Sequence, residues 1–556
     1  MLSRRASYEE IYASFRWNIP EYYNIAVDVC DKWAVSDPSR VALINIEPAG
    51  KIEAVTYGEL RLRSNRLANL LRSAGVSRGS RVAVLLPQCA DTAIAHIATY
   101  KLGAIAVPLS ILFGPDALEY RLRDAGVEAL ITTSTSYTKL ASREARLPNL
   151  KKVCLIDQRN FQAELGACSP QLEAAHTRAE DPALIIYTSG TTGMPKGALH
   201  AHRVLLGHLP GVEISHDFIP QAGDRIWTPA DWAWIGGLLD VLFPALHHGI
   251  SVVAYRFEKF SGAEAFRLIE KFGIRNAFIP PTALKMMRNA SLLDPSLKLA
   301  MRSVASGGET LGPELLEWGR DTLGVSINEF YGQTECNMIV SSCSALDPPM
   351  PGFMGRPVPG HDVRIVDDAG IECPEGVTGN IAIRSGDPVM FLGYWNNPRA
   401  TESKFVGDWM LTGDKGIREH RGWLRFLGLD DDVITSAGYR IGPGEVEDCL
   451  LKHPAVEMAG VIGKPDKDRT EIVKAYVVLK PSFRASAELA ANIGDFVRSQ
   501  LAAHEYPREV AFVDQLPLTV TGKIMRRELR ELASREAAIA VESYSSELVP
   551  ARRNSL

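Results

Sequence analysis

Apolar positions along the first two-thirds of the chain follow two spacings. Thr56 and Glu59 form a capping-box pattern that opens a helix, and apolar residues recur at helical spacing from there to Gly75. Short continuous apolar runs predict buried strands at 81–86, 104–108, 128–132, 151–156, 183–187, 251–255, 275–279 and 325–330. Because helical segments separate these runs, the pattern predicts an α/β fold with largely parallel sheets covered on both faces.

The pattern changes from about residue 352. Gly and Pro become frequent, and short alternating strands at 361–366 and 379–384 predict a smaller β-rich subdomain that reaches about residue 428. A compact α+β segment follows, with a helix at 443–452 and a strand at 474–479. We therefore predict an N-terminal domain over residues 1–430, a small C-terminal domain over 431–532, and a polar tail over 533–556.

Composition narrows the class of protein. The chain has 556 residues, too many for one hydrophobic core, and its net charge of -5 argues against a nucleic-acid-binding protein. Its eight cysteines form no CxxC pair, so we expect reduced thiols and no zinc site. The first residues lack the apolar segment of a secretory signal, and no apolar stretch is typical of a membrane span. These features predict a cytoplasmic enzyme.

The segment 187–197 (YTSGTTGMPKG) carries the most specific chemical pattern. Glycines let backbone N–H groups turn inward around an anion, hydroxyl groups donate to phosphate oxygens, and a lysine adds positive charge. The segment lacks the Gly-Lys-Ser/Thr step of a Walker loop, and a lone Ser/Gly-rich fragment would be typical of a surface turn. Its position directly after a buried strand favours a phosphate-binding loop, with candidate ligands Thr188, Ser189, Gly190, Thr191, Thr192 and Lys196.

This loop resembles the signature of the adenylate-forming superfamily of acyl-CoA synthetases, luciferases and peptide-synthetase adenylation domains. Further motifs of that superfamily follow in order between about residues 60 and 529. Within the superfamily, the chain is most similar to bacterial short- and medium-chain acyl-CoA synthetases. The resemblance implies use of ATP, Mg²⁺ and coenzyme A: a carboxylic acid becomes an acyl-adenylate, and its acyl group then passes to coenzyme A.

Two further segments resemble the nucleotide site of that superfamily. The segment 306–310 (SGGET) follows a predicted strand, and the resemblance implies that Gly307, Gly308 and Glu309 line an adenine pocket. The segment 330–335 (FYGQTE) lies at the end of strand 325–330, where open α/β sheets usually bind their ligands. The resemblance implies that Tyr331 stacks on the base, Thr334 meets the α-phosphate and Glu335 holds the metal. The remaining nucleotide-site residues of this segment are Phe330, Gly332 and Gln333.

The next motifs imply a ribose contact and a hinge. Asp414, after a glycine turn, would accept hydrogen bonds from the ribose diol. Asp431 matches the superfamily's hinge acid, about which the C-terminal domain rotates. One residue departs from the pattern: Leu429 stands where the superfamily usually has a ribose-contacting arginine. Arg425, four residues earlier and on the same face of a regular strand, is the candidate substitute.

The C-terminal domain carries the remaining catalytic candidates. By resemblance, Arg440 approaches the nucleotide in one domain pose, and the Gly438 backbone lines the pantetheine tunnel in the other. Lys523, in the segment 516–527 (LPLTVTGKIMRR), matches the catalytic lysine, whose ammonium would stabilise charge on the α-phosphate in the transition state. The matching lysine is reversibly acetylated in some relatives, which implies an acetyltransferase and a deacetylase as partners.

The acid itself is the least determined part. Acetate-specific relatives carry a tryptophan at the position of Gly332, so a glycine there predicts acids longer than propionate. Trp232, Trp234 and Gly236 match the segment that lines the acyl site, although two tryptophans at an apolar helix start also suit a core. We predict a short- to medium-chain acid. Two alternatives remain: an adenylate-forming enzyme with a non-CoA acceptor, and a catalytically silent nucleotide- or acyl-binding paralogue.

Overall fold

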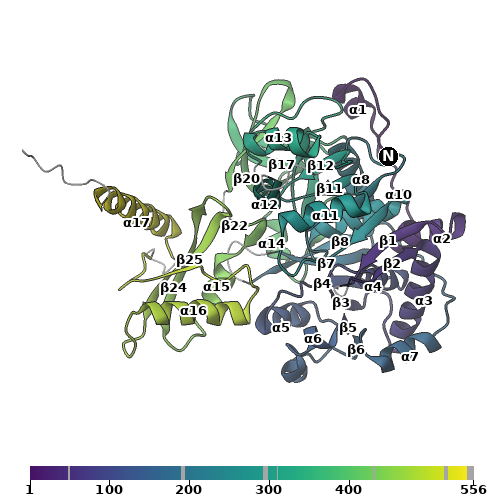
Figure 1. Cartoon of the computed structure of the whole chain (residues 1–556), viewed down its shortest axis with the longest axis horizontal. Coiled ribbons are helices and arrows are strands. Elements are labelled where there is room, and N and C mark those ends of the chain that lie inside the picture. The colour runs from purple at the N-terminus through teal and green to yellow at the C-terminus, as the bar shows by residue number, and fades with distance from the viewer. Residues whose placement is uncertain are drawn as a thin grey trace, which may run out of the picture. The chain divides into compact units, whose positions relative to one another are not determined.

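The computed structural model describes residues 1–47, 50–188, 194–291, 299–309, 311–429, 432–518 and 524–547 (Figure 1). The fold is mixed α/β, and two compact units make up the chain. The larger unit comprises Met1–Thr188 and Lys196–Asp431, and the smaller unit comprises Ser189–Pro195 and Asp432–Leu556. The predicted fold class is confirmed by the parallel-containing sheets, the β-rich region and the C-terminal α+β unit.

A seven-stranded sheet contains most of the early predicted strands. Its order is β18-β8-β7-β4-β3-β5-β6, and the pairs from β7 to β6 are parallel. The strands are β3 (Arg81–Leu85), β4 (Ile105–Pro108), β5 (Ala129–Thr132), β6 (Lys152–Leu155), β7 (Pro182–Thr188), β8 (Lys196–Ala201) and β18 (Gly393–Tyr394). The helices between them include α3 (Tyr57–Ser73), α4 (Ala90–Lys101), α5 (Pro115–Asp124) and α7 (Arg159–Ala167). The predicted capping box forms at the start of α3, where Thr56 and Glu59 satisfy each other's backbone N–H groups.

A nine-stranded sheet carries the other half of the larger unit's core. Its order is β15-β14-β13-β12-β11-β9-β10-β1-β2, parallel from β13 to β1 and antiparallel at both ends. The strands are β1 (Val41–Ile46), β2 (Ile52–Thr56), β9 (Arg225–Trp227), β10 (Ser251–Ala254), β11 (Asn276–Phe278), β12 (Ser303–Ser306), β13 (Ile327–Gln333), β14 (Cys336–Ser341) and β15 (Arg356–Pro357). Accompanying helices are α8 (Val204–Ser215), the π-helical turn η3 (Leu238–Leu242), α10 (Phe243–His248), α11 (Gly262–Phe272), α12 (Pro281–Ser291) and α13 (Pro313–Trp318).

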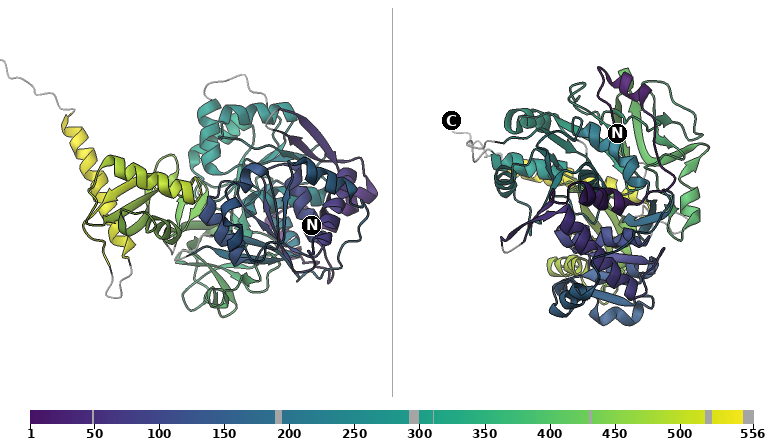
Figure 2. Two further views of the ribbon diagram at one scale, coloured as in Figure 1. Left: turned by 90° about the horizontal axis from the view of Figure 1, so that it is seen from below. Right: turned by 90° about the vertical axis from the view of Figure 1, so that its right-hand side faces the viewer.

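The β-rich subdomain is a separate antiparallel sheet. It consists of β16 (Val363–Val366), β17 (Thr378–Arg384), β19 (Phe405–Val406), β20 (Trp409–Arg418) and β21 (Leu424–Leu429). The N-terminal segment with α1 (Tyr8–Ser14) lies beside this region (Figure 2). There the Tyr8 hydroxyl donates to Pro357 O at 2.6 Å and Trp17 Nε1 donates to Gly360 O at 2.9 Å. These hydrogen bonds attach the N-terminal segment to the end of β15 and to the residues that follow it.

The smaller unit is an α+β structure. Its sheet contains β22 (Ile434–Ser436), β23 (Tyr439–Ile441), β24 (Val456–Asp466), β25 (Thr470–Leu479) and β26 (Glu509–Phe512), accompanied by α15 (Pro443–Leu450), α16 (Ala487–Gln500) and α17 (Arg526–Glu547). The expectation of a loose tail from residue 533 is wrong for the first part of that segment. Ala533 is buried and Glu536 accepts a hydrogen bond from Tyr476, so α17 has a packed face here.

Candidate active site

The ends of the predicted phosphate-binding loop lie side by side. Thr188 closes β7 and Lys196 opens β8, and the antiparallel register sets these two residues directly opposite each other. The strand leading into the loop is almost wholly buried, as its apolar run predicts. Ser189, Gly190, Thr191 and Thr192 lie outside the described residues. The described part of the motif is thus the base of the connection between two antiparallel strands. It places Thr188 and Lys196 side by side where β7 ends and β8 begins.

The predicted metal and phosphate residues form the tip of a second hairpin. Strand β13 runs on to Gln333 instead of ending at Phe330, because β14 turns back and pairs with it. Gln333 is opposite Cys336, so Thr334 and Glu335 are the two-residue turn. Thr334 is partly exposed, whereas Glu335 is buried with 5% of its surface accessible. The hairpin therefore presents a hydroxyl and a carboxylate from adjacent positions.

Glu335 is held by a residue that the motif did not reveal. The Tyr394 hydroxyl, from β18, donates a hydrogen bond to Glu335 Oε1. The Lys196 ammonium lies over the ring of the same tyrosine, 5.2 Å from its centroid. Tyr394 therefore links the lysine of the first loop to the carboxylate of the hairpin. It is 59 residues away from Glu335 in the sequence, and no spacing in its Gly-Pro-rich surroundings indicates the contact.

The predicted base and ribose residues contact each other directly. The Tyr331 hydroxyl donates to Asp414 Oδ2 at 2.5 Å, and the Asp414 side chain is buried. Burial, followed by the negative charge of Asp414, raises the pKa of Tyr331 well above its usual range, so the phenol stays protonated and donates. Beside this pair, Gln333 Nε2 and Lys404 Nζ both donate to Thr412 O, at 2.9 and 2.8 Å. The Gln333 bond attaches β13 to β20, and the Lys404 bond attaches the residue before β19 to the same carbonyl.

The predicted adenine segment lies next to the same hairpin. Gly307 follows β12, and a Cβ on it would lie 2.7 Å from Phe330 Cε2, so no side chain fits there. Gly308 has φ +93°, a backbone conformation that favours glycine. Glu309 is buried and accepts a hydrogen bond from Thr282 Oγ1 at 3.0 Å. Both glycines are thus required by the local geometry, which brings this segment against β13.

The four predicted acyl-site residues have different surroundings. Trp232 is 1% exposed and belongs to the main hydrophobic core. Trp234 is half-buried and meets Phe113 edge to face, with ring centroids 5.7 Å apart. Gly236 lies against Phe278, whose Cε1 would be 3.0 Å from an added Cβ. A Cβ on Gly332 would lie 2.4 Å from Met338 N. The direction of a side chain at Gly332 is therefore into β14.

Arg425 does not substitute for the missing arginine at position 429. Leu429 is opposite Asp414 in the β20–β21 pairing, but a bulge follows and Arg425 is opposite Ile417. Asp414 and Ile417 are three positions apart on β20, so they face opposite sides of the sheet. Arg425 instead pairs with Glu419 at 3.0 Å and lies over the Phe353 ring, 4.5 Å from its centroid. The expectation assumed a regular strand, and the bulge overturns it.

In the smaller unit, Ala437 and Gly438 form the two-residue turn between β22 and β23, with φ +52° and +82°. Such a turn needs positive φ at both positions, which explains the glycine. Arg440 is on β23, opposite Thr435. Asp431 and Lys523 lie outside the described residues. The small-domain motif thus places Gly438 at the tip of a hairpin and Arg440 on its second strand.

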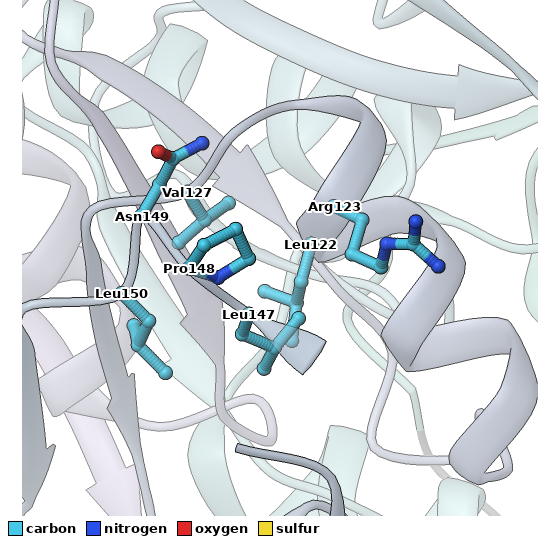
Figure 3. Close-up of a pocket in the computed structure, with 7 residues that line it drawn as sticks. All are labelled: Leu122, Arg123, Val127, Leu147, Pro148, Asn149 and Leu150. Atoms are coloured by element: carbon cyan, nitrogen blue, oxygen red, sulfur yellow. The ribbon is translucent and has the colours of Figure 1, made fainter. Parts of the chain in front are cut away.

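A surface pocket of about 220 Å³ lies away from these residues (Figure 3). It is formed by the end of α5 and the segment before β6, and its lining is Leu122, Arg123, Val127, Leu147, Pro148, Asn149 and Leu150. It shares no residue with the predicted nucleotide or acyl site. Among the described residues there is also no cluster of three or more His, Cys, Asp or Glu able to hold a metal, and no helix long and apolar enough to cross a membrane.

Comparison with known families identifies the fold. The profile of the AMP-binding enzyme family matches residues 30–395, and that of the AMP-binding enzyme C-terminal domain matches residues 445–523. The two matches cover most of the larger unit and part of the smaller one, and they include the segments 187–197, 306–310 and 330–335 and the residue Lys523, whereas the positions from Asp414 to Arg440 lie between them. The chain belongs to the AMP-binding enzyme family of the adenylate-forming superfamily, as the motif series implied.

Individual relatives are similar in sequence to this chain along nearly its whole length. The chain is 34% identical over 547 residues to the acetyl-coenzyme A synthetase of Bacillus subtilis, which covers 94% of each protein. It is 32% identical over 544 residues to a mitochondrial acyl-coenzyme A synthetase of Mus musculus, covering 95% of this chain and 93% of that one. The crystal structure of an acyl-CoA synthetase from Brucella canis is 33% identical, with a TM-score of 0.71 over 96% of this chain and 100% of that one.

Proposed function

We propose that this protein ligates a short- to medium-chain carboxylic acid to coenzyme A, with ATP cleaved to AMP and pyrophosphate. The observation that carries the proposal is the convergence around the β13–β14 hairpin. Tyr331 bonds to Asp414, Glu335 bonds to Tyr394, and Tyr394 lies under Lys196. Four segments far apart in the sequence thereby meet, and their side chains are of the kinds that bind a nucleoside triphosphate. Relatives named acetyl- and acyl-coenzyme A synthetases support the acid–CoA reaction.

Nucleotide binding is assigned to the larger unit. The backbone and hydroxyl groups of the loop 188–197 bind the phosphates, together with Lys196. Gly307 and Gly308 allow close approach of the adenine, Tyr331 packs on the base, and Asp414 accepts from the ribose hydroxyls. Because Asp414 already accepts from the Tyr331 hydroxyl at 2.5 Å, base and ribose binding are coupled through one hydrogen bond.

Glu335 is the residue that fits a Mg²⁺ ion. Mg²⁺ prefers oxygen ligands and is usually held by one or two carboxylates together with substrate phosphates. A single buried carboxylate on a hairpin linked through Tyr394 to Lys196 of the phosphate loop matches that preference. When bound with the nucleotide, the ion would neutralise phosphate charge. Thr334, the neighbouring turn residue, donates to the α-phosphate.

In the first half-reaction, a carboxylate oxygen of the acid attacks the α-phosphorus of ATP. The bond to the bridging oxygen of the β-phosphate breaks, and pyrophosphate leaves with that electron pair. The residues act by holding the two reactants in line and by balancing negative charge that grows on the α-phosphate. Lys523 supplies a positive charge that meets this phosphate mainly in the transition state.

In the second half-reaction, the thiol of coenzyme A releases its proton to solvent and its sulfur attacks the acyl carbonyl carbon. The bond between that carbon and the phosphate oxygen breaks, and AMP leaves with the electron pair. The smaller unit turns about Asp431, which withdraws Lys523 and Arg440 from the nucleotide and presents the Gly438 backbone to the pantetheine arm. The glycine has no side chain and occupies the tip of a two-residue turn, which suits a backbone that must approach a narrow ligand.

The acyl pocket is assigned to the segment around Trp232, Trp234 and Gly236, together with Gly332 on the β13–β14 hairpin. The half-buried Trp234 and the neighbouring Phe113 limit its depth, which favours acids shorter than long-chain fatty acids. We place the enzyme in the cytoplasm, where its eight free cysteines remain reduced. Reversible acetylation of Lys523 by an acetyltransferase and a deacetylase would switch the first half-reaction off and on.

The test is an assay of the purified chain with ATP, Mg²⁺, coenzyme A and a series of acids from acetic to palmitic. We expect AMP and acyl-CoA to form in equal amounts, with the highest kcat/KM among acids of intermediate length. Hydroxylamine in place of coenzyme A traps the adenylate and separates the half-reactions. Pyrophosphate release without acyl-CoA formation would indicate another acceptor. Release of neither product would indicate a silent paralogue, and highest activity on palmitate would overturn the chain-length assignment.

A further inference from the structure

A buried polar cluster lies between the two glycines assigned to the acyl pocket. It consists of Asp240 on η3, Asn337 on β14 and His208 on α8. A Cβ on Gly236 would lie 3.6 Å from Asp240 Oδ2, and a Cβ on Gly332 would lie 2.7 Å from Asn337 Oδ1. The cluster is thus adjacent to both glycines, and none of its members belongs to the nucleotide site.

Asp240 presents an unused donor. Its side chain is buried, and Oδ1 accepts a hydrogen bond from Asn337 Nδ2 at 2.6 Å. Oδ2 has no partner within the described part of the chain. Burial raises the pKa of Asp240 well above its usual range, which favours the protonated form of the carboxyl group. Because Oδ1 accepts from the amide, a proton on this carboxyl group would occupy Oδ2, the oxygen that faces Gly236.

His208 presents an unused acceptor. Its Nδ1 lies 2.7 Å from Val204 O, and a carbonyl oxygen can only accept, so Nδ1 carries the ring proton. Burial lowers the pKa of His208 to about 4, and the neutral ring then has a lone pair on Nε2. Nε2 has no partner among the described residues. It lies 4.0 Å from Asp240 Oδ1, too far for a hydrogen bond between them.

A buried polar atom left without a hydrogen-bond partner is destabilising, and this cluster has two of them, Asp240 Oδ2 and His208 Nε2. A hydroxyl group is the simplest single group that completes both, because it accepts from one partner and donates to another. A ketone would satisfy Asp240 only. An ammonium group would satisfy His208 only and would require Asp240 to ionise in a buried site.

We propose that Asp240 and His208 form a recognition site for a hydroxyl group on the acid, so that the preferred substrates are hydroxy-substituted carboxylic acids. Asp240 donates to the substrate hydroxyl oxygen, that hydroxyl donates to His208 Nε2, and Asn337 positions Asp240. The inference rests on the proposed function, since it assumes that Gly236 and Gly332 border the acyl pocket. A site of this kind discriminates strongly against the analogue without the hydroxyl, because the buried protein groups are then left unpaired.

The experiment compares matched pairs of acids on the wild-type enzyme. Each straight-chain acid from butanoic to octanoic is assayed beside its isomers with a hydroxyl at successive carbons, and benzoic acid beside the hydroxybenzoic acids. The readout is kcat/KM for pyrophosphate release. We expect at least one hydroxy acid to exceed its parent acid by about tenfold or more. If every parent acid exceeds all its hydroxy derivatives, the cluster holds a structural water and the proposal is wrong.

Two variants test whether the preference for hydroxy acids depends on Asp240. Asp240→Leu, of similar volume, should lower the ratio of kcat/KM for the preferred hydroxy acid to kcat/KM for its parent acid by about tenfold or more. Asp240→Asn retains a donor and should keep most of the preference. An equal fall for both acids would assign Asp240 a purely structural role. Should Asp240→Leu fail to fold, the wild-type comparison still decides. Pyrophosphate release with parent acids alone would refute this inference only, whereas no release with any acid would refute the proposed function as well.

Discussion

A single phenol, Tyr394, determines how the predicted metal-binding carboxylate is held. Its hydroxyl donates to Glu335, and its ring lies beneath the Lys196 ammonium at 5.2 Å. Hydrogen-bonded neighbours of metal-binding carboxylates fix the orientation of the ligand, and their removal commonly weakens metal affinity or activity 10–100-fold. Removal of this hydroxyl alone therefore tests whether Glu335 needs to be positioned.

We expect Tyr394→Phe to raise the Mg²⁺ concentration needed for half-maximal pyrophosphate release by about tenfold, because the carboxylate loses the bond that orients it. The ring, and with it the contact to Lys196, remains. The control is Tyr187→Phe, which removes a hydroxyl bonded to Asp124 at 2.6 Å and leaves Glu335 untouched. If the two variants show the same Mg²⁺ dependence, Glu335 does not act through the metal.

Glu329, two residues before Tyr331, is a buried carboxyl group whose ionisation should make the stability of the fold depend on pH. Desolvation raises its pKa to about 8. The folded protein keeps this carboxyl protonated up to about pH 8, whereas the unfolded chain ionises it above about pH 4.5. The unfolded state therefore binds fewer protons in this window, and the contribution of Glu329 to stability is lost as pH rises through it.

Glu329→Gln, which cannot ionise, should remove that loss. Relative to wild type, the variant should gain on the order of 3 kcal/mol in unfolding free energy between about pH 5 and about pH 8. Denaturant unfolding at both pH values measures it. Glu375→Gln, at an exposed position, is the matched control and should show no such gain. A constant difference between Glu329→Gln and wild type at all pH values would contradict the assignment.

The hairpin of β13 and β14 is the element on which the site depends. Its glycine, Gly332, is enclosed by the returning strand, and a Cβ there would meet Met338 N at 2.4 Å and Asn337 Cα at 2.6 Å. A larger side chain at this position would therefore require a different path of the hairpin. In this chain the glycine keeps Asn337 close to Asp240, so it affects the acyl pocket through the backbone of β14.

Gly332→Ala should consequently shift the hairpin. Forcing a methyl group into well-packed backbone typically costs about 1–3 kcal/mol, and kcat/KM for the acid should fall because Thr334 and Glu335 move with the turn. Thermal unfolding and steady-state kinetics measure the two effects. Gly166→Ala is the control: its added Cβ meets nothing within 4 Å, and it replaces glycine in a helix, so it should be neutral or slightly stabilising. Wild-type stability and kcat/KM for Gly332→Ala would show that β14 can shift at little cost in free energy.

Elements were predictable from the sequence where one local pattern decides them. Continuous apolar runs identified strands such as β3 and β10, and the Thr56–Glu59 pair located the start of α3. Features set by pairing between strands were missed. The bulge that turns Arg425 away depends on the ladder between β20 and β21, and the extension of β13 to Gln333 depends on β14. The Tyr394–Glu335 bond likewise exists only after two sheets are assembled.

At the scale of the whole molecule, the proposed chemistry is divided between two units. The proposed nucleotide-binding residues Tyr331, Glu335 and Asp414 belong to the larger unit, whereas Arg440 and Lys523 belong to the smaller one. A division of this kind lets one unit keep its ligands while the other exchanges catalytic groups between steps. It also predicts that single substitutions separate the two half-reactions, which residues within one rigid site would not do.

Lys523→Ala tests most directly whether the two half-reactions can be separated. Loss of a charge that meets the α-phosphate in the transition state should slow pyrophosphate release by roughly 10²–10³. Transfer from chemically prepared acyl-adenylate to coenzyme A forms no such charge, so its rate should stay within a few-fold of wild type. Gly438→Leu should give the reverse result, because a bulky side chain at the hairpin tip obstructs the thiol but not adenylation. Equal losses in both half-reactions for both variants would mean that the smaller unit serves each step from one fixed position.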